Sequence, residues 1–261
     1  MALRMAGTDF DDRLIRRTFA QGLPNPAPVT MTWWYYQDSN RGTYNSYMAA
    51  GPTTFTGSDY YFCGHFNDAS FSYEIAVNAQ DVLGVPSVAG RWIRQGFRCV
   101  KVSGSSDHKL EFWTNLPSNE VITYTNPNSL VWGANTELRF GGPAHNTVES
   151  IDGRMAGIKI WEAALPLEAI KREAMSDMLV LPQYAPRIWA IVPARVAGDY
   201  KDYSGKGRHF TPRNTITSIA GPGSARKDQA SFWLPSDAII PPGGGSVRQA
   251  LGLSLGLGIN I

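Results

Sequence analysis

The segment 153–170, GRMAGIKIWEAALPLEAI, is the part of the sequence that most constrains the fold. It opens with a glycine turn, continues as a short strand and reaches a second turn at 163–164. The apolar residues of this strand are Met155, Ile158 and Ile160. A helical pattern follows directly, so the segment predicts a joint between a strand and a helix.

The helix after this joint is expected to be amphipathic. Pro166 suits the first helical position, because its fixed φ fits the first turn. Glu168 lies in that turn, where the helix dipole favours a carboxylate. One apolar stripe at helical period consists of Leu167, Ile170, Ala174 and Met178. A single amphipathic helix after a run of strands must bury its stripe on a sheet. We therefore expect a mostly β protein with one short helix on the outside.

The sequence on either side of the joint predicts many strands. Residues 29–36 are β-branched and aromatic, and the unbroken run 33–36 (WWYY) indicates a central strand buried on both faces. Residues 60–66 and 71–79 predict a hairpin across the turn 67–70. Further strands are expected at 91–102, 109–114, 121–124, 137–140 and 187–193. Strands with polar turns at intervals of about 8–12 residues are typical of an all-β antiparallel β-sandwich or jelly roll.

The 261 residues are enough for one large β-sandwich with an appendage. We predict an N-terminal arm over 1–28, a jelly-roll domain over 29–192 and a basic, turn-rich extension over 193–261. Within the arm, a short helix is expected over 9–20, with Phe10, Leu14 and Ile15 on one side.

Charge is distributed unevenly along the chain, although the net charge is only +2. Residues 187–261 contain nine lysines and arginines against four aspartates, a net charge of +5. Such a segment can contact an acidic partner or nucleic acid. The basic residues are scattered and show no rhythm of stacking aromatics, which favours a solvated arm over a nucleic-acid partner.

The last eleven residues alternate without a fault between apolar and small or polar residues. The apolar positions are Leu251, Leu253, Leu255, Leu257, Ile259 and Ile261. The segment follows a linker-like run, PPGGGS, at 241–246. We predict a strand that either completes its own sheet or docks on a neighbouring subunit by strand addition.

Two further features bear on compartment. Cys63 and Cys99 do not make a disulfide framework, so buried thiols are the default and a disulfide between them the alternative. The first residues contain no apolar h-region, and no window approaches the roughly 18 apolar residues of a membrane span. We therefore expect no signal peptide, synthesis in a cytoplasm and no membrane partner.

Three stretches together resemble a known superfamily. They are VTMTWWYY at 29–36, the strand-turn-strand sequence 91–115 with Trp92 and the trio 111–113, and LRFGG at 138–142 followed by 151–170. This order and spacing resemble the concanavalin A-like lectin/glucanase superfamily, and within it the laminin G-like and pentraxin-like jelly rolls. The run 202–209, DYSGKGRH, resembles the D-x-S-G-x-G-x-H turn of such jelly rolls.

The chain departs from the calcium-binding members of this group. Ala156 and Gly157 stand where many relatives have acidic residues, and 136–138 (TEL) occupies the place of an acid and amide cluster. Glu149 matches one further ligand position, but a calcium site needs roughly six or more oxygens. We therefore expect no metal and no cofactor.

The sequence lacks the acidic and histidine patterns of two catalytic classes. Glycosidases of this fold resemble one another in an E-x-D-x-x-E strand, whereas Glu149 and Asp152 here have a different spacing. The histidines His65, His108, His145 and His209 are far apart and match no zinc pattern. We expect a protein that is not an enzyme.

Three functions follow as hypotheses. The leading one is a non-catalytic structural or decoration protein of a virus particle, most plausibly a bacteriophage, whose terminal arms dock on neighbouring subunits of a homo-oligomer or on a capsid or tail protein. The second is a carbohydrate-binding module or adhesin that contacts a surface glycan through Trp34, Tyr44 or Tyr47, although packing is the alternative role of such aromatics. The third is a carbohydrate-active enzyme.

Overall fold

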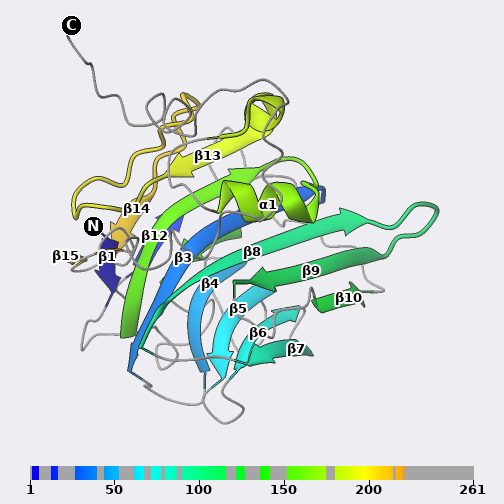
Figure 1. The fold of residues 1–261 in the computed structure, drawn as a ribbon, viewed down its shortest axis with the longest axis horizontal. Helices are drawn as coiled ribbons and strands as arrows, with labels where there is room; N and C mark the ends of the chain where they lie inside the picture. The colour runs from blue at the N-terminus through cyan, green and yellow to red at the C-terminus, as the bar shows by residue number, and fades with distance from the viewer. Residues whose placement is uncertain are drawn as a thin grey trace, which may run out of the picture. The chain divides into compact units, whose positions relative to one another are not determined.

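The computed structural model describes residues 2–5, 13–16, 27–39, 44–52, 62–67, 72–77, 80–86, 90–115, 122–126, 136–141, 152–174, 180–213, 216–219 and 221. These residues form an antiparallel β-sandwich of jelly-roll type with one short α-helix (Figure 1). They belong to a compact unit spanning Met1–Ser224, and Ala225–Ile261 form a second unit. The described helices are α1 (Leu167–Glu173) and the 3-10 helix η1 (Pro182–Arg187). Neither has the length and apolarity needed to cross a bilayer.

The first sheet has eight strands among the described residues. Its order is β10 (Ile122–Asn126), β9 (His108–Thr114), β8 (Trp92–Lys101), β3 (Val29–Ser39), β12 (Asp152–Trp161), β1 (Ala2–Met5) and β15 (Thr217–Ile219), and β13 (Ile188–Val192) also pairs with β12. The strand predicted to be central, β3, lies between β8 and β12. The predicted pair 91–102 and 109–114 forms the hairpin β8–β9.

The second sheet has seven described strands. Its order is β14 (Thr211–Arg213), β2 (Arg13–Arg16), β11 (Thr136–Phe140), β4 (Tyr44–Pro52), β5 (Phe62–Asn67), β6 (Ser72–Val77) and β7 (Gln80–Pro86). The predicted hairpin of residues 60–66 and 71–79 is confirmed by the antiparallel pairing of β5 with β6. The neighbouring predictions 121–124 and 137–140 form β10 and β11, which belong to different sheets.

The main core contains alternate residues of the first sheet. In β3 it takes Val29, Met31, Trp33 and Tyr35, and from the second sheet it takes Met48, Leu138 and Phe140. The ring of Trp33 meets that of Phe140 edge to face, with centroids 6.1 Å apart. The other face of β3 is buried as well, since Trp34 is only 4% exposed. The run WWYY therefore lies in a strand buried on both faces, as predicted.

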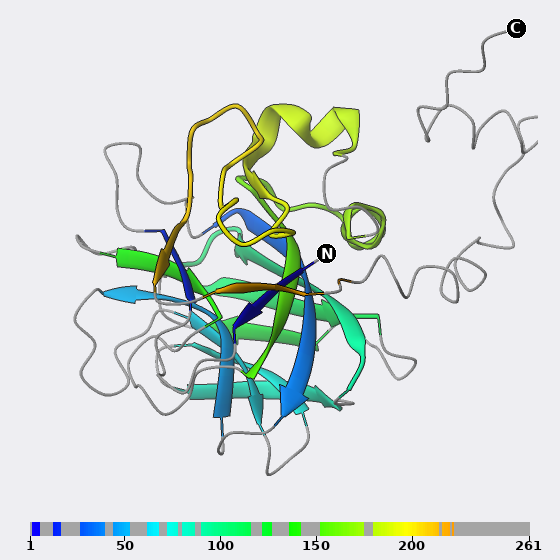
Figure 2. The ribbon, with the colours of Figure 1, turned by 90° about the vertical axis from the view of Figure 1, so that its left-hand side faces the viewer.

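Helix α1 (Leu167–Glu173) covers the side of the first sheet that faces away from the second sheet (Figures 1 and 2). It packs in a separate apolar cluster with Trp113, Trp161 and Ile188. The predicted helix on the outside of a sheet is thus confirmed. Its buried face consists of Ala169, Ile170 and Glu173, while Leu167 is only partly buried. Met178 lies outside the described residues.

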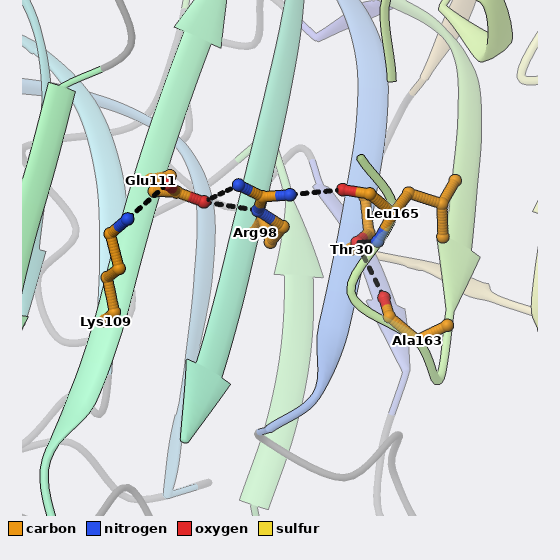
Figure 3. A network of polar contacts seen from close by, with 6 residues as sticks. All are labelled: Thr30, Arg98, Lys109, Glu111, Ala163 and Leu165. Atoms are coloured by element: carbon orange, nitrogen blue, oxygen red, sulfur yellow. Dashed lines mark hydrogen bonds and ion pairs between the residues drawn. The ribbon is translucent and has the colours of Figure 1, made fainter. Parts of the chain in front are cut away.

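The loop between β12 and α1 is fixed to the sheet by side chains of β3 and β8 (Figure 3). The hydroxyl of Thr30 donates to the carbonyl of Ala163 (2.7 Å) and accepts from the N–H of Leu165 (3.0 Å). Nη1 of Arg98 donates to the carbonyl of Leu165 (2.6 Å). These contacts set the turn from which the helix begins.

Arg98 is held in turn by a carboxylate of the neighbouring strand. Its guanidinium forms an ion pair with Glu111, which also contacts Nζ of Lys109 at 2.9 Å (Figure 3). Burial would raise the pKa of Glu111, but the hydrogen bonds and positive charges of Lys109 and Arg98 outweigh it and lower that pKa. The ionised carboxylate therefore stabilises the contact between loop and sheet.

Strand β12 has two partners along one edge. Its first half pairs with β1 and its second half with β13, and a register shift separates the halves between Ala156 and Lys159. At this irregularity Gly157 has φ 61°, and its N–H donates to the carbonyl of Pro193 at 2.8 Å. Glycine adopts this left-handed conformation without the clash of a Cβ.

The helix expected over 9–20 is wrong for the residues described there. Arg13–Arg16 form strand β2, which pairs with β11 on one side and β14 on the other. Hydrogen bonds to two neighbouring strands satisfy this backbone, and such tertiary pairing outweighs a weak local helix propensity. The isolated pattern of Leu14 and Ile15 therefore does not determine the local structure.

Both predicted arms contribute strands to the sandwich. Strands β1 and β2 come from residues 1–28 and join the first and second sheets, respectively. From the expected extension, β15 pairs with β1 and β14 with β2. The expected boundaries at residues 28 and 192 thus fall inside one compact unit.

Candidate functional site

The aromatic residues proposed as glycan contacts differ in what the structure describes. Tyr44 and Tyr47 lie on β4, and their side chains are outside the described part. Trp34 is 4% exposed, and the guanidinium carbon of Arg94 lies 4.6 Å from its ring centroid. A ring so deeply buried does not present an open face for a sugar. The docking residues Leu251, Leu253, Leu255, Leu257, Ile259 and Ile261 also lie outside the described residues.

Trp34 belongs to a cluster of aromatic rings and arginines on the outer face of the first sheet. Tyr36 meets Trp92 edge to face at 5.6 Å, and the guanidinium carbon of Arg154 lies 4.4 Å from the Tyr36 centroid. Nε of Arg154 lies 2.9 Å from both carboxylate oxygens of Asp38. The cation–π contacts and this ion pair allow the arginines to pack on the outer face of the sheet. The cluster therefore has a structural role.

A second polar group lies on β11. Its alternate residues Leu138 and Phe140 enter the core, whereas Glu137 and Arg139 pair with each other, with Nη2 and Oε2 2.5 Å apart. Both side chains are at least 95% buried. Glu137 lies in the segment 136–138, which stands in the place of the calcium-binding cluster of relatives, and its carboxylate is bound by the guanidinium of Arg139. Within the described ranges, no three His, Cys, Asp or Glu residues gather as metal ligands.

The run 202–209 forms an ordered loop beside β13. We call residues 196–209 the Asp202 loop. Tyr203 N–H donates to the carbonyl of Ile191 at 2.7 Å, and the N–H of Ile191 donates to Oδ1 of Asp202 at 2.9 Å. Trp189 on the same strand accepts from Nη1 of Arg208 at 2.8 Å. The loop thus satisfies the backbone groups on the free edge of β13.

Asp202 organises this loop through a buried carboxylate. It accepts hydrogen bonds from the N–H of Ser204 (2.8 Å), the hydroxyl of Ser204 (2.8 Å) and the N–H of Arg208 (3.0 Å). Burial would raise the pKa of Asp202, but these bonds and the one from Ile191 outweigh it and lower that pKa. The loop therefore depends on an ionised Asp202.

The spacing D-x-S-G-x-G-x-H has a physical reason here. Gly205 and Gly207 have φ values of 80° and 68°, and the space where a Cβ would stand is open at both. Their role is conformational, because they allow the chain to turn back within four residues. His209 completes the turn by accepting the N–H of Asp202 on Nδ1 at 3.0 Å.

The outward side of the Asp202 loop carries the exposed large apolar side chains of the described part. Tyr203 is 47% exposed and Val196 is 40% exposed. Asp199 connects them, because its N–H donates to the carbonyl of Val196 (3.0 Å) and its Oδ2 accepts from the hydroxyl of Tyr203 (2.6 Å). The hydrogen bond to Asp199 raises the pKa of Tyr203, so the phenol remains a donor held in one orientation.

Ser204 and His209 do not form a nucleophile–base contact. The hydroxyl of Ser204 donates to Oδ2 of Asp202, and Nδ1 of His209 accepts from the backbone of Asp202. A catalytic serine needs its hydroxyl bonded to the imidazole that removes its proton. Both side chains stabilise the turn instead.

Cys99 is a buried thiol, which confirms the default prediction for this residue. Cys99 is free and fully buried in β8. Burial raises its pKa to about 12. The alternative of a disulfide with Cys63 is wrong for this structure.

Comparisons with known proteins identify the fold. No protein-family model matches the chain, and no curated protein matches its sequence. A native heptameric SAP-like pentraxin from Limulus polyphemus is similar in structure, with a TM-score of 0.53 and 15% identity over 83% of this chain and 94% of the pentraxin. The chain thus has a jelly-roll fold similar to that of this pentraxin.

Two more solved structures are similar with lower TM-scores. The full extracellular region of zebrafish Gpr126/Adgrg6 gives a TM-score of 0.49 and 10% identity over 84% of this chain and 26% of that region. The CBM40 of the Ruminococcus gnavus IT-sialidase gives 0.43 and 11% identity over 64% of this chain and 95% of that module.

The sequence predicts the turn at 202–209 but not the exposed surface of the loop that contains it. Val196 and Tyr203 carry no periodic pattern, because they lie in a loop between strands that are far apart in the sheets. The nearest signal was the turn motif itself, whose glycines and aspartate indicate a fixed backbone. That signal does not say which side chain of the loop faces outward.

Proposed function

We propose that this chain is a non-catalytic carbohydrate-binding protein that contacts its ligand through the Asp202 loop. The observation that carries the proposal is the exposed ring of Tyr203 with its hydroxyl fixed on Asp199. Such a ring offers an apolar face to the C–H groups of a sugar, and the neighbouring carboxylate offers acceptors to sugar hydroxyls. Loops fixed on a rigid scaffold are the usual place for recognition.

The stiffness of the loop supports binding without an ordering cost. Asp202 fixes the backbone on both sides of Tyr203, through the N–H groups of Ile191, Ser204 and Arg208. A ligand therefore meets a surface that is already in place, and preorganisation of this kind improves affinity. The fold shared with a pentraxin is compatible with this role.

The experiment is a binding titration of the full chain against a panel of neutral and charged glycans. We expect saturable binding that Tyr203→Ala abolishes and that Tyr203→Phe weakens by a few fold, since the phenylalanine keeps the ring but loses the contact to Asp199. Both variants should melt within a few degrees of the wild type, because surface substitutions change stability little. Binding that is unchanged in Tyr203→Ala would disprove this site.

A second candidate function is favoured by a separate observation. The apolar residues alternate with small or polar ones from Leu251 to Ile261, directly after the linker-like run 241–246 and the four residues that follow it. This supports docking on neighbouring subunits, as in a structural or decoration protein of a virus particle such as a phage. Leu253→Asp with Leu257→Asp should then abolish self-association in light scattering.

A matched control places the same charges on the other set of alternating positions. Gly252→Asp with Gly256→Asp should leave self-association intact if only the apolar face docks. The docking function would be contradicted if both variant chains self-associated to the same extent. It would also be contradicted if the wild type were monomeric and no capsid or tail protein co-purified with it.

A further inference from the structure

We propose that the Asp202 loop prefers acidic glycans, whose carboxylate or sulfate groups are attracted by Lys201 and Lys206. This inference rests on the carbohydrate-binding function proposed above. The exposed ring of Tyr203 accounts for stacking on a sugar, and the charged residues near it in the sequence decide which sugars are preferred.

The charges of the loop divide into those used internally and those that face solvent. Asp202 is 7% exposed and its carboxylate is fully engaged by donors of its own loop. Arg208 is half-buried, with its guanidinium bonded to the carbonyl of Trp189 and 4.7 Å from the centroid of that ring. These two residues build the loop, and their opposite charges add no net charge to it.

The exposed side chains leave an excess of positive charge beside Tyr203. Lys201 and Lys206 are exposed, and they lie two positions before and three positions after the ring. The neighbouring acidic group, Asp199, already accepts the hydroxyl of Tyr203 and lies 3.4 Å from the N–H of Lys201. The loop that would hold a ligand stacked on Tyr203 therefore carries two exposed lysines and one carboxylate whose acceptor capacity is partly used.

The geometry favours a glycan over a nucleic acid as the anionic partner. The loop offers one exposed aromatic ring and two lysines on a short, fixed turn, whereas single-stranded nucleic acids bind along grooves with several stacking rings. Two ammonium groups suit a polysaccharide that carries one negative charge on every sugar or on every second sugar. One sugar of such a ligand would stack on the ring of Tyr203.

The test uses polysaccharides in matched charged and neutral forms. The full chain is titrated with polygalacturonate and its fully methyl-esterified form, and with dextran sulfate and dextran, with double-stranded DNA as a comparison. We expect about tenfold or more tighter binding of an acidic form than of its neutral form. Higher salt should reduce this difference, because exposed charges are screened within about 10 Å at 0.1 M ionic strength. The two acidic polymers separate carboxylate from sulfate recognition.

Charge variants locate the preference. Lys201→Gln with Lys206→Gln should lower affinity for the acidic form about fivefold or more and leave the neutral form unchanged. Arg91→Gln with Lys101→Gln removes the same charge from exposed residues at the two ends of β8 and should have no effect.

The outcomes separate this inference from the function on which it rests. Equal binding of charged and neutral forms, with loss in Tyr203→Ala, would overturn the acidic preference and leave carbohydrate binding in place. An acidic preference unchanged in the Lys201 and Lys206 variant, or DNA binding as tight as glycan binding, would also overturn it. No binding to any polysaccharide would overturn both proposals.

Discussion

Gly96 on β8 lies directly beneath Ile170 of helix α1, so that a Cβ added to the glycine would stand 2.6 Å from Cγ2 of the isoleucine. Gly96 is the partner of Thr32 on one side and Trp113 on the other. The missing side chain lets the helix approach the sheet at this point. The contact couples one residue of the strand to the position of the whole helix.

We expect Gly96→Ala to destabilise the protein by about 1–3 kcal/mol, since it overpacks this contact. Ile170→Ala should cost about 2–5 kcal/mol because it leaves a cavity. In the double variant the added methyl enters that cavity, so the loss should be smaller than the sum by about 1 kcal/mol or more. Urea unfolding measures all four chains of this cycle. Gly104→Ala, at a turn with open space around it, should add to Ile170→Ala without coupling.

A buried ion pair fixes the far end of the same helix. Nζ of Lys159 lies 2.8 Å from Oε2 of Glu173, and both side chains are at most 1% exposed. The other carboxylate oxygen of Glu173 accepts from the N–H of Leu181 at 2.6 Å. Lys159→Met should therefore destabilise the protein by about 3–5 kcal/mol, because it leaves a buried carboxylate without its cation.

The partner variant separates charge from packing. Lys159→Met combined with Glu173→Gln removes the buried charge but keeps an acceptor for Leu181, so we expect it to recover at least half of the lost stability in urea unfolding. Lys171→Ala breaks the exposed pair with Glu168 and should cost less than about 0.5 kcal/mol. A loss in the double variant as large as in Lys159→Met would show that the unpaired carboxylate is not the cause.

The fold was predictable where the sequence has a period or a strong composition. The WWYY run predicted a doubly buried strand, and the segment 153–170 predicted a strand, a turn and a docked helix. Strands β1, β2, β14 and β15 have only three or four residues each. Such short strands form because neighbouring strands supply their hydrogen bonds. No local sequence pattern therefore predicts them.

The site was less predictable for a related reason. The WWYY run favoured burial of Trp34, whereas the glycan hypothesis required its exposure. The structure shows burial, because Trp34 lies on the central strand β3. The motif at 202–209 indicated a turn, but its place on the edge of β13 depends on contacts between segments that no spacing encodes. The exposure of Tyr203 follows from that placement.

The thiol of Cys99 provides a test of the core. Burial in β8 raises its pKa to about 12, so almost no thiolate exists near neutral pH. In a Cys63→Ser background, we expect no reaction of the folded protein with Ellman's reagent at about pH 8 and one reacting thiol per chain in guanidinium chloride, since the thiolate is the nucleophile. Rapid labelling of the folded chain would contradict the burial of this strand.

Asp202 should make stability depend on pH in the acid range. Its hydrogen bonds lower its pKa in the folded protein below the ordinary value of 3.8. This contribution is therefore fully present above the ordinary pKa and is lost as the pH falls through the lower, folded value. We expect Asp202→Asn to cost about 2 kcal/mol at neutral pH, because amide hydrogens then face the N–H donors of the loop. The difference between wild type and variant, measured by urea unfolding from about pH 7 to pH 2, should shrink below about pH 4. A difference between wild type and Asp202→Asn that does not change with pH would contradict the role given to this carboxylate.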